Sequence, residues 1–483
     1  MRECRSQFSF QARYQLFRVL SERNGCGSTL RNSVRDSPIF LFTSIPHRCR
    51  CRARQWKPLV RWIVCRNSSR LLSQTDTRLR SCGRYKRCRN DSELWVSSRG
   101  TIRRDRATNL SPSPRSGGDK YDVAVVGGGP AGAAAVLELA NNGLRAILLE
   151  SQPSPTCKIG ETLPPEARLV LRSIGVWEMF LRDGQLPSAG ICSSWGSSEV
   201  AERDFIFNPH GCGWQLDRAK FEGLLLRAAK KRGATVLQGE TVRGLRRVEG
   251  IWIIELNSRS VLASWVVDAS GRRAAIARRM DVIRIILDQL VSISTIAPSG
   301  EKIESDNRTF IEARPDGWWY SALLPDGRRM LAFQTDAEFV KGQQWRDPRW
   351  FRTKLAETEH LSTLLESEGS RTDGTCYLTS AHSGRLYRCF GEGWVAAGDA
   401  AQSYDPLSGQ GILSALTSGQ QAGRALSSDG PKISQALLTY CAAMEGRWKR
   451  FLQQRRHFYA MEQRFGHSPF WQTRAVTVRH GSQ

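Results

Sequence analysis

The sequence predicts an α/β protein that contains a doubly wound, mainly parallel sheet, a second antiparallel sheet and closing C-terminal helices. The first indication is a strand, a glycine-rich turn and a helix that follow one another over residues 121–140. The second is a later strand that ends in Gly398-Asp399 and runs into another glycine-rich helix start. The third is a set of short strands between these motifs, expected at 285–297, 308–324 and 329–336.

The charge of the chain is concentrated near its beginning. The 483 residues include 71 Lys and Arg against 46 Asp and Glu, and residues 1–118 hold 26 of the basic and only 7 of the acidic ones. We interpret 1–118 as a spurious or disordered extension, with a targeting segment and a nucleic-acid-binding segment as alternatives. No nucleic-acid-binding motif and no membrane-spanning apolar run is present, so we expect neither a nucleic-acid nor a membrane partner.

A dinucleotide-binding fingerprint opens the remaining part of the chain. The apolar strand 121–126 leads into Gly127-Gly-Gly-Pro-Ala-Gly132 and then into a strong helix former. In this pattern the first glycine permits a tight turn, the second lets a pyrophosphate approach the backbone, and the third lets the helix pack closely. A second strand ends at an acid, where a carboxylate can bind ribose hydroxyls. The expected nucleotide-binding residues are Gly127, Gly129, Pro130, Ala131, Gly132 and Glu150.

The late motif favours FAD over NAD. Gly398-Asp399 and the following Pro406, Gly409 and Gly411 resemble the glutathione-reductase-type flavoproteins, in which a late Gly-Asp contacts the ribityl chain. The resemblance implies that Asp399 is the ribityl ligand and that a helix N-terminus near Gly411 faces the flavin N1/O2 edge. That helix end carries positive partial charge, which suits the negative charge of a reduced flavin.

Two further segments match this class. Strand 266–268 ends in Asp268 before a glycine turn, and Arg218 resembles an arginine near the cofactor, with a solvated helix arginine as the alternative. Asp217 is expected to cap that helix. The predicted organisation is an FAD-binding domain at 119–280 and 390–428, a substrate-domain sheet and helix at 281–389, and a C-terminal helical region at 429–483.

Less specific sequence patterns indicate which family of flavoproteins the chain resembles. The segment Ile159-Gly160-Glu161-Thr-Leu-Pro-Pro165 resembles flavin-dependent halogenases. Over about 120–465 the chain resembles a branch that looks like tryptophan halogenases but helps mature peptidyl tryptophan-derived quinone cofactors. This implies a monooxygenase that uses O₂ and reduced flavin to hydroxylate an aromatic ring, an indole of a small molecule or of a tryptophan-bearing partner protein. NAD(P)H or an external flavin reductase would supply electrons. Glu161 and Lys158 are the candidate catalytic residues, with a loop contact and a surface lysine as the respective alternatives.

Three alternatives stay open: a halogenase, a flavin-dependent reductase of the isoprenoid type, and a non-catalytic FAD-binding scaffold for maturation. The Trp-x-Trp-x-Ile-Pro motif of tryptophan halogenases is not reproduced in 317–325, which disfavours the first. Trp318 and Trp319 are expected to pack on opposite faces of a sheet.

Helices are expected at 345–367 and 433–465. The apolar face of the second includes Leu437, Leu438, Met444, Trp448 and Leu452.

Metal binding and disulfides are not expected. The seven histidines lack ligand spacing, and no metal is assigned. No C-x-x-C pair occurs after residue 118, so the cysteines there are interpreted as reduced thiols of a cytoplasmic protein. They are Cys157, Cys192, Cys212, Cys376, Cys389 and Cys441.

Overall fold

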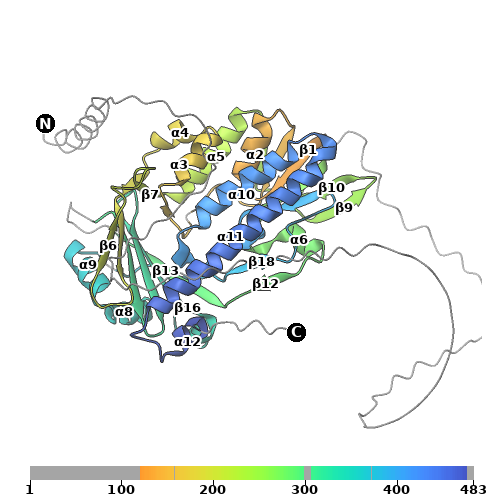
Figure 1. Ribbon diagram of the computed structural model, residues 1–483. Coiled ribbons are helices and arrows are strands. Elements are labelled where there is room, and N and C mark those ends of the chain that lie inside the picture. Colours follow the sequence, from red (N-terminus) through yellow and green to blue (C-terminus); the bar gives the residue numbers. More distant parts are fainter. Residues whose placement is uncertain (1–119, 157, 299–305, 371, 476–483) are drawn as a thin grey trace, which may run out of the picture. The chain divides into compact units, whose positions relative to one another are not determined.

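The computed structural model describes residues 120–156, 158–298, 306–370 and 372–475. The extension 1–118 and Cys157 lie outside the described residues. Within these ranges the chain forms a large parallel-type sheet, a large antiparallel sheet, two small sheets and the helices around them, so the α/β fold class is confirmed (Figure 1). No helix of the described ranges combines the length and the apolar character needed to span a bilayer.

The eight-stranded sheet carries the fingerprint. Five parallel strands follow the order β20-β11-β1-β2-β8, so the carboxyl ends of these strands share one edge, here called the carboxyl edge. Antiparallel strands extend the sheet on β20 and β11. The strands are β1 (Lys120–Val126), β2 (Ala146–Glu150), β8 (Thr235–Gln238), β9 (Gly244–Val248), β10 (Ile251–Glu255), β11 (Ser260–Asp268), β19 (Phe390–Gly391) and β20 (Trp394–Ala396).

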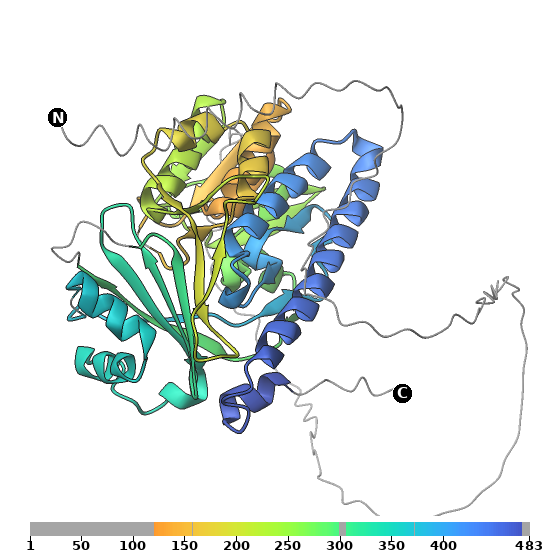
Figure 2. The same ribbon diagram turned by 60° about the vertical axis from the view of Figure 1, so that its left-hand side comes forward.

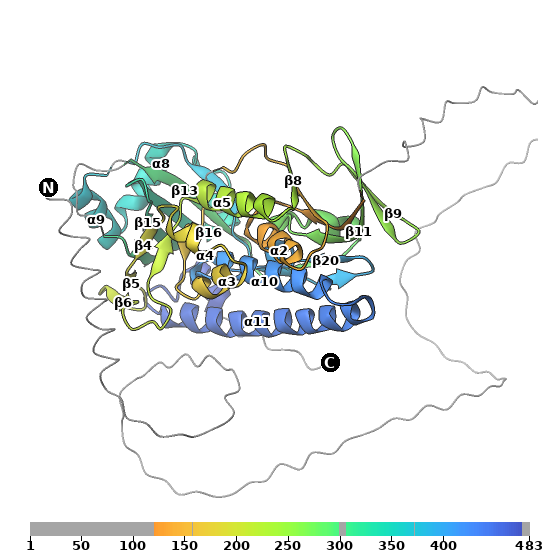
Figure 3. The same ribbon diagram turned by 90° about the horizontal axis from the view of Figure 1, so that it is seen from above.

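Glycines let the early and late helices touch. Helix α2 (Pro130–Asn141) lies between α5 (Arg218–Lys231) and α10 (Gly411–Leu426), and α11 (Ile433–Met461) runs along the outer side of α10 (Figure 3). A methyl group at Gly419 of α10 would lie 2.0 Å from the Ala131 carbonyl oxygen, so only glycine allows this approach. The α2–α10 contact therefore brings the two sequence motifs to the same end of the sheet.

The antiparallel sheet has seven strands in the order β17-β13-β16-β15-β14-β5-β6, with β14 and β5 as the one parallel pair. The strands expected from the sequence are confirmed, although 308–324 is a hairpin and 285–297 includes a separate short strand, β12 (Arg284–Ile286). Strands β5 and β6 come from inside the range 119–280 that was expected to be nucleotide-binding. The sheet strands are β5 (Gly190–Ser194), β6 (Ala201–Asp204), β13 (Leu290–Ala297), β14 (Thr309–Arg314), β15 (Gly317–Leu323), β16 (Arg329–Asp336) and β17 (Tyr377–Ser380).

The two faces of this sheet have different partners. Helices α8 (Pro348–Ala356) and α9 (His360–Glu368) cover one face, and the other, here called the inner face, lies toward α10 and α11 (Figure 2). Trp319 packs on Phe351 of α8, whereas Trp318 belongs to the cluster that contains Tyr459 of α11. The expected packing of the tryptophan pair on opposite faces is therefore confirmed.

The remaining elements join these parts. One small sheet has the order β3-β7-β4 and the other β12-β18-β21. The strands are β3 (Thr162–Leu163), β4 (Leu186–Ser188), β7 (Gly213–Gln215), β18 (Gly384–Leu386) and β21 (Gln402–Ser403); the helices are α3 (Ala167–Ser173), α4 (Trp177–Leu181), α6 (Ala275–Arg279), α7 (Ala337–Val340) and α12 (Pro469–Ala475).

Two expectations about the C-terminal region are wrong. Cys389 and Cys441 form a disulfide, although both were expected to be reduced. The two cysteines are 52 residues apart in the sequence, and only the docking of α11 beside β19 brings them together. Leu438 is 54% exposed and does not belong to the buried face of α11, whereas Leu437, Met444 and Trp448 are buried as expected. The helix itself ends at Met461.

Candidate active site

The glycine-rich loop after β1 has the backbone that its sequence predicts. Gly127 has a φ of +110°, and a methyl group there would lie 2.3 Å from the Ala269 carbonyl oxygen. A methyl group at Gly132 would lie 1.9 Å from the Gly127 carbonyl oxygen, so α2 packs directly on the turn. At Gly129, by contrast, a methyl group would meet no atom of the described chain within 4 Å. The loop is therefore tight toward the sheet and open at the first turn of α2.

Glu150 lies beside this loop, at the end of β2. Its Oε2 accepts a hydrogen bond from the Gly128 backbone N–H at 2.5 Å, and its Oε1 accepts one from the Gln152 N–H at 2.8 Å. Pro130 starts α2, where its missing N–H costs nothing. The carboxylate and the helix start thus lie at the same edge, which is where a ribose and a pyrophosphate would be held.

The late motif meets the fingerprint directly. Gly398 has a φ of +60°, and a methyl group there would lie 2.6 Å from the Ala131 side chain at the start of α2. The next residue, Asp399, is 28% exposed, and its Oδ2 lies 2.9 Å from Arg272. Arg284 donates to the Asp399 backbone carbonyl at 3.0 Å. The predicted ribityl ligand is therefore held by two arginines beside the glycine loop.

The loop that leads into α10 is anchored by a buried acid that the sequence did not single out. Asp405 is 1% exposed, and its Oδ1 accepts the Leu407 N–H, which caps the short turn beginning at Pro406. Its Oδ2 accepts hydrogen bonds from Arg455 at 3.1 Å and from the Tyr459 hydroxyl at 2.9 Å, both on α11. Burial raises the pKa of the Asp405 carboxyl, and the charge of Arg455 opposes that shift.

Beyond this anchor the backbone is open. Gly409 has a φ of +59°, and methyl groups at Gly409 and Gly411 would meet no atom of the described chain within 4 Å. Within that chain, the N-cap residue Gln410 makes no side-chain capping hydrogen bond to α10. The first N–H groups of α10 are thus available to a negatively charged ligand.

Two other predicted site residues, Asp268 and Arg218, form hydrogen bonds to backbone groups. Both oxygens of Asp268 accept backbone hydrogen bonds, from Ser270 on one side and from Ile276 and Ala277 on the other, so this acid caps α6. The Arg218 guanidinium donates to the Gly160 carbonyl oxygen at 2.8 Å.

Lys158 and Arg218 share one acid on α5. The ammonium of Lys158 lies 2.6 Å from Glu222, and Arg218 lies 2.5 Å from the other oxygen of the same carboxylate. Asp217 caps α5 through the Lys220 N–H, as expected. Lys158 and Arg218 thus fasten the segment that leads to Glu161.

Glu161 is the most unusual titratable group near these loops. Its side chain is buried, with a relative exposure of 2%, and burial raises the pKa of its carboxyl from 4.5 to about 7. The Tyr320 hydroxyl, on the inner face of the antiparallel sheet, lies 3.3 Å from Oε2. Oε1 accepts no hydrogen bond from any residue of the described chain.

A buried polar chain continues from Tyr320. Its hydroxyl lies 2.7 Å from the Thr162 hydroxyl, which donates to Gln215 Oε1 at 2.9 Å. The Gln215 amide in turn donates to Thr309 at 2.9 Å. Glu161 therefore stands at the end of a hydrogen-bonded chain that joins β3 and β7 to β14 and β15.

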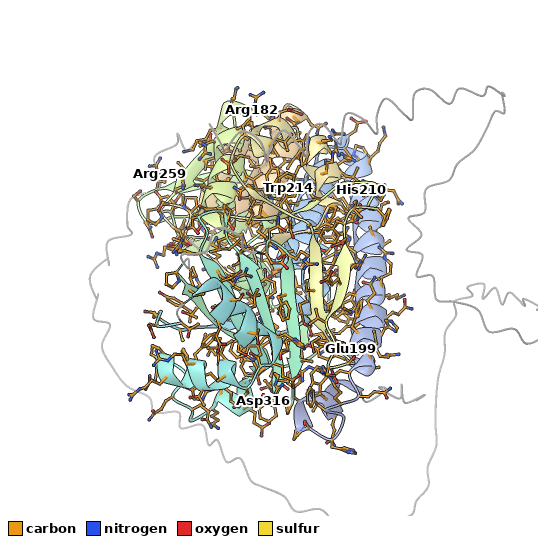
Figure 4. All side chains as sticks on the ribbon, turned by 90° about the vertical axis from the view of Figure 1, so that its left-hand side faces the viewer. Arg182, Glu199, His210, Trp214, Arg259 and Asp316 are labelled. Atoms are coloured by element: carbon orange, nitrogen blue, oxygen red, sulfur yellow. A yellow bond between two sulfur atoms is a disulfide. The ribbon has the colours of Figure 1, made fainter. Side chains whose placement is uncertain are left out.

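Both loops from the carboxyl edge meet one strand of the antiparallel sheet. Trp318 and Tyr320 lie two residues apart on the inner face of β15. Trp318 donates a hydrogen bond to the Tyr459 hydroxyl, which donates to Asp405, and the Tyr320 hydroxyl contacts Glu161. Figure 4 shows Trp214, beside β3, where this sheet meets the nucleotide-binding part, and Asp316 at the opposite end of the sheet. The candidate site thus lies between the carboxyl edge and the inner face.

A cavity of about 360 Å³ lies elsewhere. It is lined by Arg247, Trp252 and Trp394, among others, and therefore lies near the amino end of β20. It contains none of the predicted site residues, and Arg247 forms an ion pair with Glu392 at its rim.

The residues present fit FAD. Two glycine motifs present open backbone at the starts of α2 and α10, and Glu150 and Asp399 lie beside them. The sequence did not identify Tyr320, Asp405, Arg455 or Tyr459 as parts of this arrangement. Tyr320 lies in the segment 317–325 that was compared with the halogenase motif, but its role depends on sheet register, which no local pattern predicts.

Comparison with known proteins agrees with this geometry. The family described as FAD binding domain matches residues 120–442. The putative FAD-dependent oxidoreductase LodB of Marinomonas mediterranea is 30% identical over 374 residues, which cover 75% of this chain and 100% of that protein. The flavin-dependent halogenase armH3 of Armillaria mellea is 28% identical over 62% of this chain and 66% of its own length.

Solved structures share the fold. The flavin-dependent halogenase CmlS has a TM-score of 0.67 at 22% identity, covering 74% of this chain and 68% of its own. The peptidyl tryptophan dihydroxylase QhpG has a TM-score of 0.62 at 24% identity, covering 75% and 80%. The expected resemblance is confirmed: the chain belongs to the FAD binding domain family and is an FAD-dependent oxidoreductase of the halogenase-like flavoenzymes.

Proposed function

We propose that this protein is an FAD-dependent monooxygenase that hydroxylates an indole ring, on a small molecule or on a tryptophan of a partner protein. The observation that carries the proposal is the meeting of the two FAD-side loops with Trp318 and Tyr320 on one sheet face, beside the buried acid Glu161. Similarity to LodB over that protein's whole length supports an FAD-dependent oxidoreductase, and the fold shared with a peptidyl tryptophan dihydroxylase supports hydroxylation.

Different residues of the chain would bind different parts of the cofactor and the substrate. The start of α2 and Glu150 would hold the pyrophosphate and ribose, and Asp399 the ribityl chain, while the start of α10 would face the flavin ring. Bound FAD would supply, in its reduced form, the two electrons and two protons that balance insertion of one O₂ oxygen into a ring C–H bond and release of the other as water. Glu161 would contact the substrate ring.

A halogenase is the second candidate, because several relatives that match this chain are flavin-dependent halogenases. That chemistry is expected to use a lysine in the site. Lys158 is instead 40% exposed and paired with Glu222 on α5. This pairing favours hydroxylation, and it leaves Lys158 the role of fastening the segment before Glu161.

The test supplies FAD, a source of reduced flavin and a tryptophan-bearing peptide or free tryptophan to the purified protein. NAD(P)H alone and NAD(P)H with a separate flavin reductase are compared as electron sources. With isotopically labelled O₂, the product should gain labelled oxygen whether or not chloride or bromide is present. A product that forms only with halide would show a halogenase. A reduced carbon–carbon double bond in a polyprenyl substrate would show a reductase, and FAD binding without turnover a scaffold.

A further inference from the structure

The two oxygens of the Glu161 carboxyl have different surroundings. The Tyr320 hydroxyl donates a hydrogen bond to Oε2 at 3.3 Å and lies 2.7 Å from the Thr162 hydroxyl. Thr162 in turn donates to Gln215 Oε1 at 2.9 Å. Oε2 therefore has a donor among the described residues, whereas Oε1 accepts no hydrogen bond from them.

The environment of the carboxyl favours its neutral form. Its exposure is 2%, and burial raises its pKa to about 7, although the backbone N–H of Glu161, the charge of Arg218 and the backbone N–H of Gly160 all act to lower it. A neutral carboxyl keeps a carbonyl-type oxygen, which accepts hydrogen bonds as a carboxylate oxygen does. Oε1 can therefore act as an acceptor in either protonation state.

Within the described residues, Oε1 lacks a donor with hydrogen-bond geometry, although the backbone N–H groups of Glu161 and Gly160 lower the pKa of the carboxyl. Oε1 is shielded from solvent and accepts no hydrogen bond from the described chain. A buried acceptor of this kind carries a desolvation cost until a donor reaches it. The neighbour of this acid on the inner face is the aromatic side chain of Tyr320, whose hydroxyl lies 3.3 Å from Oε2.

We propose that Glu161 Oε1 accepts a hydrogen bond from the ring N–H of the aromatic substrate and so selects N–H heteroaromatics over rings of the same shape without that donor. This inference rests on the proposed function, because it places the substrate ring between the flavin-side loops and the inner face. The hydrogen bond would also make the ring more electron-rich, which assists electrophilic attack on its carbon atoms. Glu161 would thus set both the orientation and the chemical class of the substrate.

The test compares indole with benzofuran, which has the same two-ring shape with oxygen in place of N–H. Binding to the FAD-loaded protein is measured by the change in the flavin absorbance spectrum. Wild type should bind indole at least about tenfold more tightly, as expected for a hydrogen bond to a buried acceptor. Glu161→Met should abolish the preference. Glu161→Gln should keep it, because the amide can donate to Tyr320 and present its carbonyl oxygen where Oε1 stands.

Glu312→Gln is the matched control. Glu312 is a second buried glutamate of the same sheet, but its carboxylate accepts backbone N–H groups at the start of α9, away from the inner face. The preference for indole should survive in this variant. Equal binding of both probes by wild type, binding of neither, or a preference that survives Glu161→Met would overturn the inference.

Hydroxylation of indole is scored separately, by the mass of the product under labelled O₂. A labelled product without any preference for indole would refute the N–H site and leave the proposed monooxygenase standing. A preference for indole that depends on Glu161, without any product, would support the site and count against the monooxygenase. The two claims therefore fail independently.

Discussion

The buried carboxyl of Glu161 should cost the fold stability at neutral pH, and replacing it by an amide should remove that cost. The pKa of this carboxyl rises from 4.5 to about 7 because burial disfavours its charge. The folded protein then holds a proton that the unfolded chain releases, so wild type loses stability as pH rises from 4.5 to about 7 and stays lower above it. At about 1.36 kcal/mol per pKa unit, the loss is about 3 kcal/mol.

Glu161→Gln carries no charge and should escape this loss. At pH 8 its free energy of unfolding should exceed that of wild type by about 3 kcal/mol, which for the roughly 350 described residues corresponds to a Tm higher by roughly 4 °C. At pH 4 the two proteins should melt nearly together. Scanning calorimetry of both FAD-loaded proteins from pH 4 to pH 8 measures the difference.

Glu312→Gln separates charge burial from the loss of hydrogen bonds. Glu312 is also buried, but its oxygens accept the N–H groups of Glu359, His360 and Leu361, so the amide should lower Tm. The two substitutions should therefore have opposite signs at pH 8. A Glu161→Gln protein that melts at or below wild type at pH 8, or a difference that does not change with pH, would refute the reasoning.

Three further substitutions test the arrangement of the loops. Asp399→Ala should strip FAD, measured by flavin absorbance after gel filtration, while the Tm of the apoprotein changes little; retained stoichiometric flavin would contradict the ribityl role. Gly398→Ala should lower both Tm and FAD content, because its methyl group would lie 2.6 Å from the Ala131 side chain at a φ of +60°; an unchanged FAD affinity would argue against the contact. Arg455→Met should destabilise the protein by about 3–5 kcal/mol in chemical denaturation, since it leaves the buried charge of Asp405 unpaired. Combining it with Asp405→Asn should recover part of that loss, and strictly additive effects would show that the pair is not coupled.

The parts of the fold that the sequence predicts are those fixed by local backbone geometry. Gly127 has a φ of +110°, and a methyl group at Gly132 would lie 1.9 Å from the Gly127 carbonyl oxygen in the same turn, so the residue type itself reports the turn. Short apolar runs likewise predict strands of the antiparallel sheet, where β13, β15 and β16 are almost continuously buried. These constraints act within a few residues, so the FAD motifs and most strand positions could be predicted from the sequence.

The parts that could not be predicted depend on residues far apart in the chain. Glu161 and Tyr320 are 159 residues apart, and their contact requires both the register of β15 and the docking of β3. The disulfide between Cys389 and Cys441 likewise depends on where α11 lies on the sheet. The sequence identified Glu161 as a candidate, but only its burial and its missing donor indicate what it could bind.

The long helix α11 links the two halves of the candidate site. Arg455 contacts Asp405 of the flavin-side loop and Asp288 at the start of the antiparallel sheet, at 3.1 and 3.2 Å. One turn further along α11, the Tyr459 hydroxyl donates a hydrogen bond to Asp405 and accepts one from the indole N–H of Trp318. Because these groups are buried and mutually paired, moving either part would leave charges or donors unpaired in a poorly solvated place. The helix therefore fixes the separation between the loop that would face the flavin and the sheet face that would hold the substrate, so neither sheet defines the site by itself.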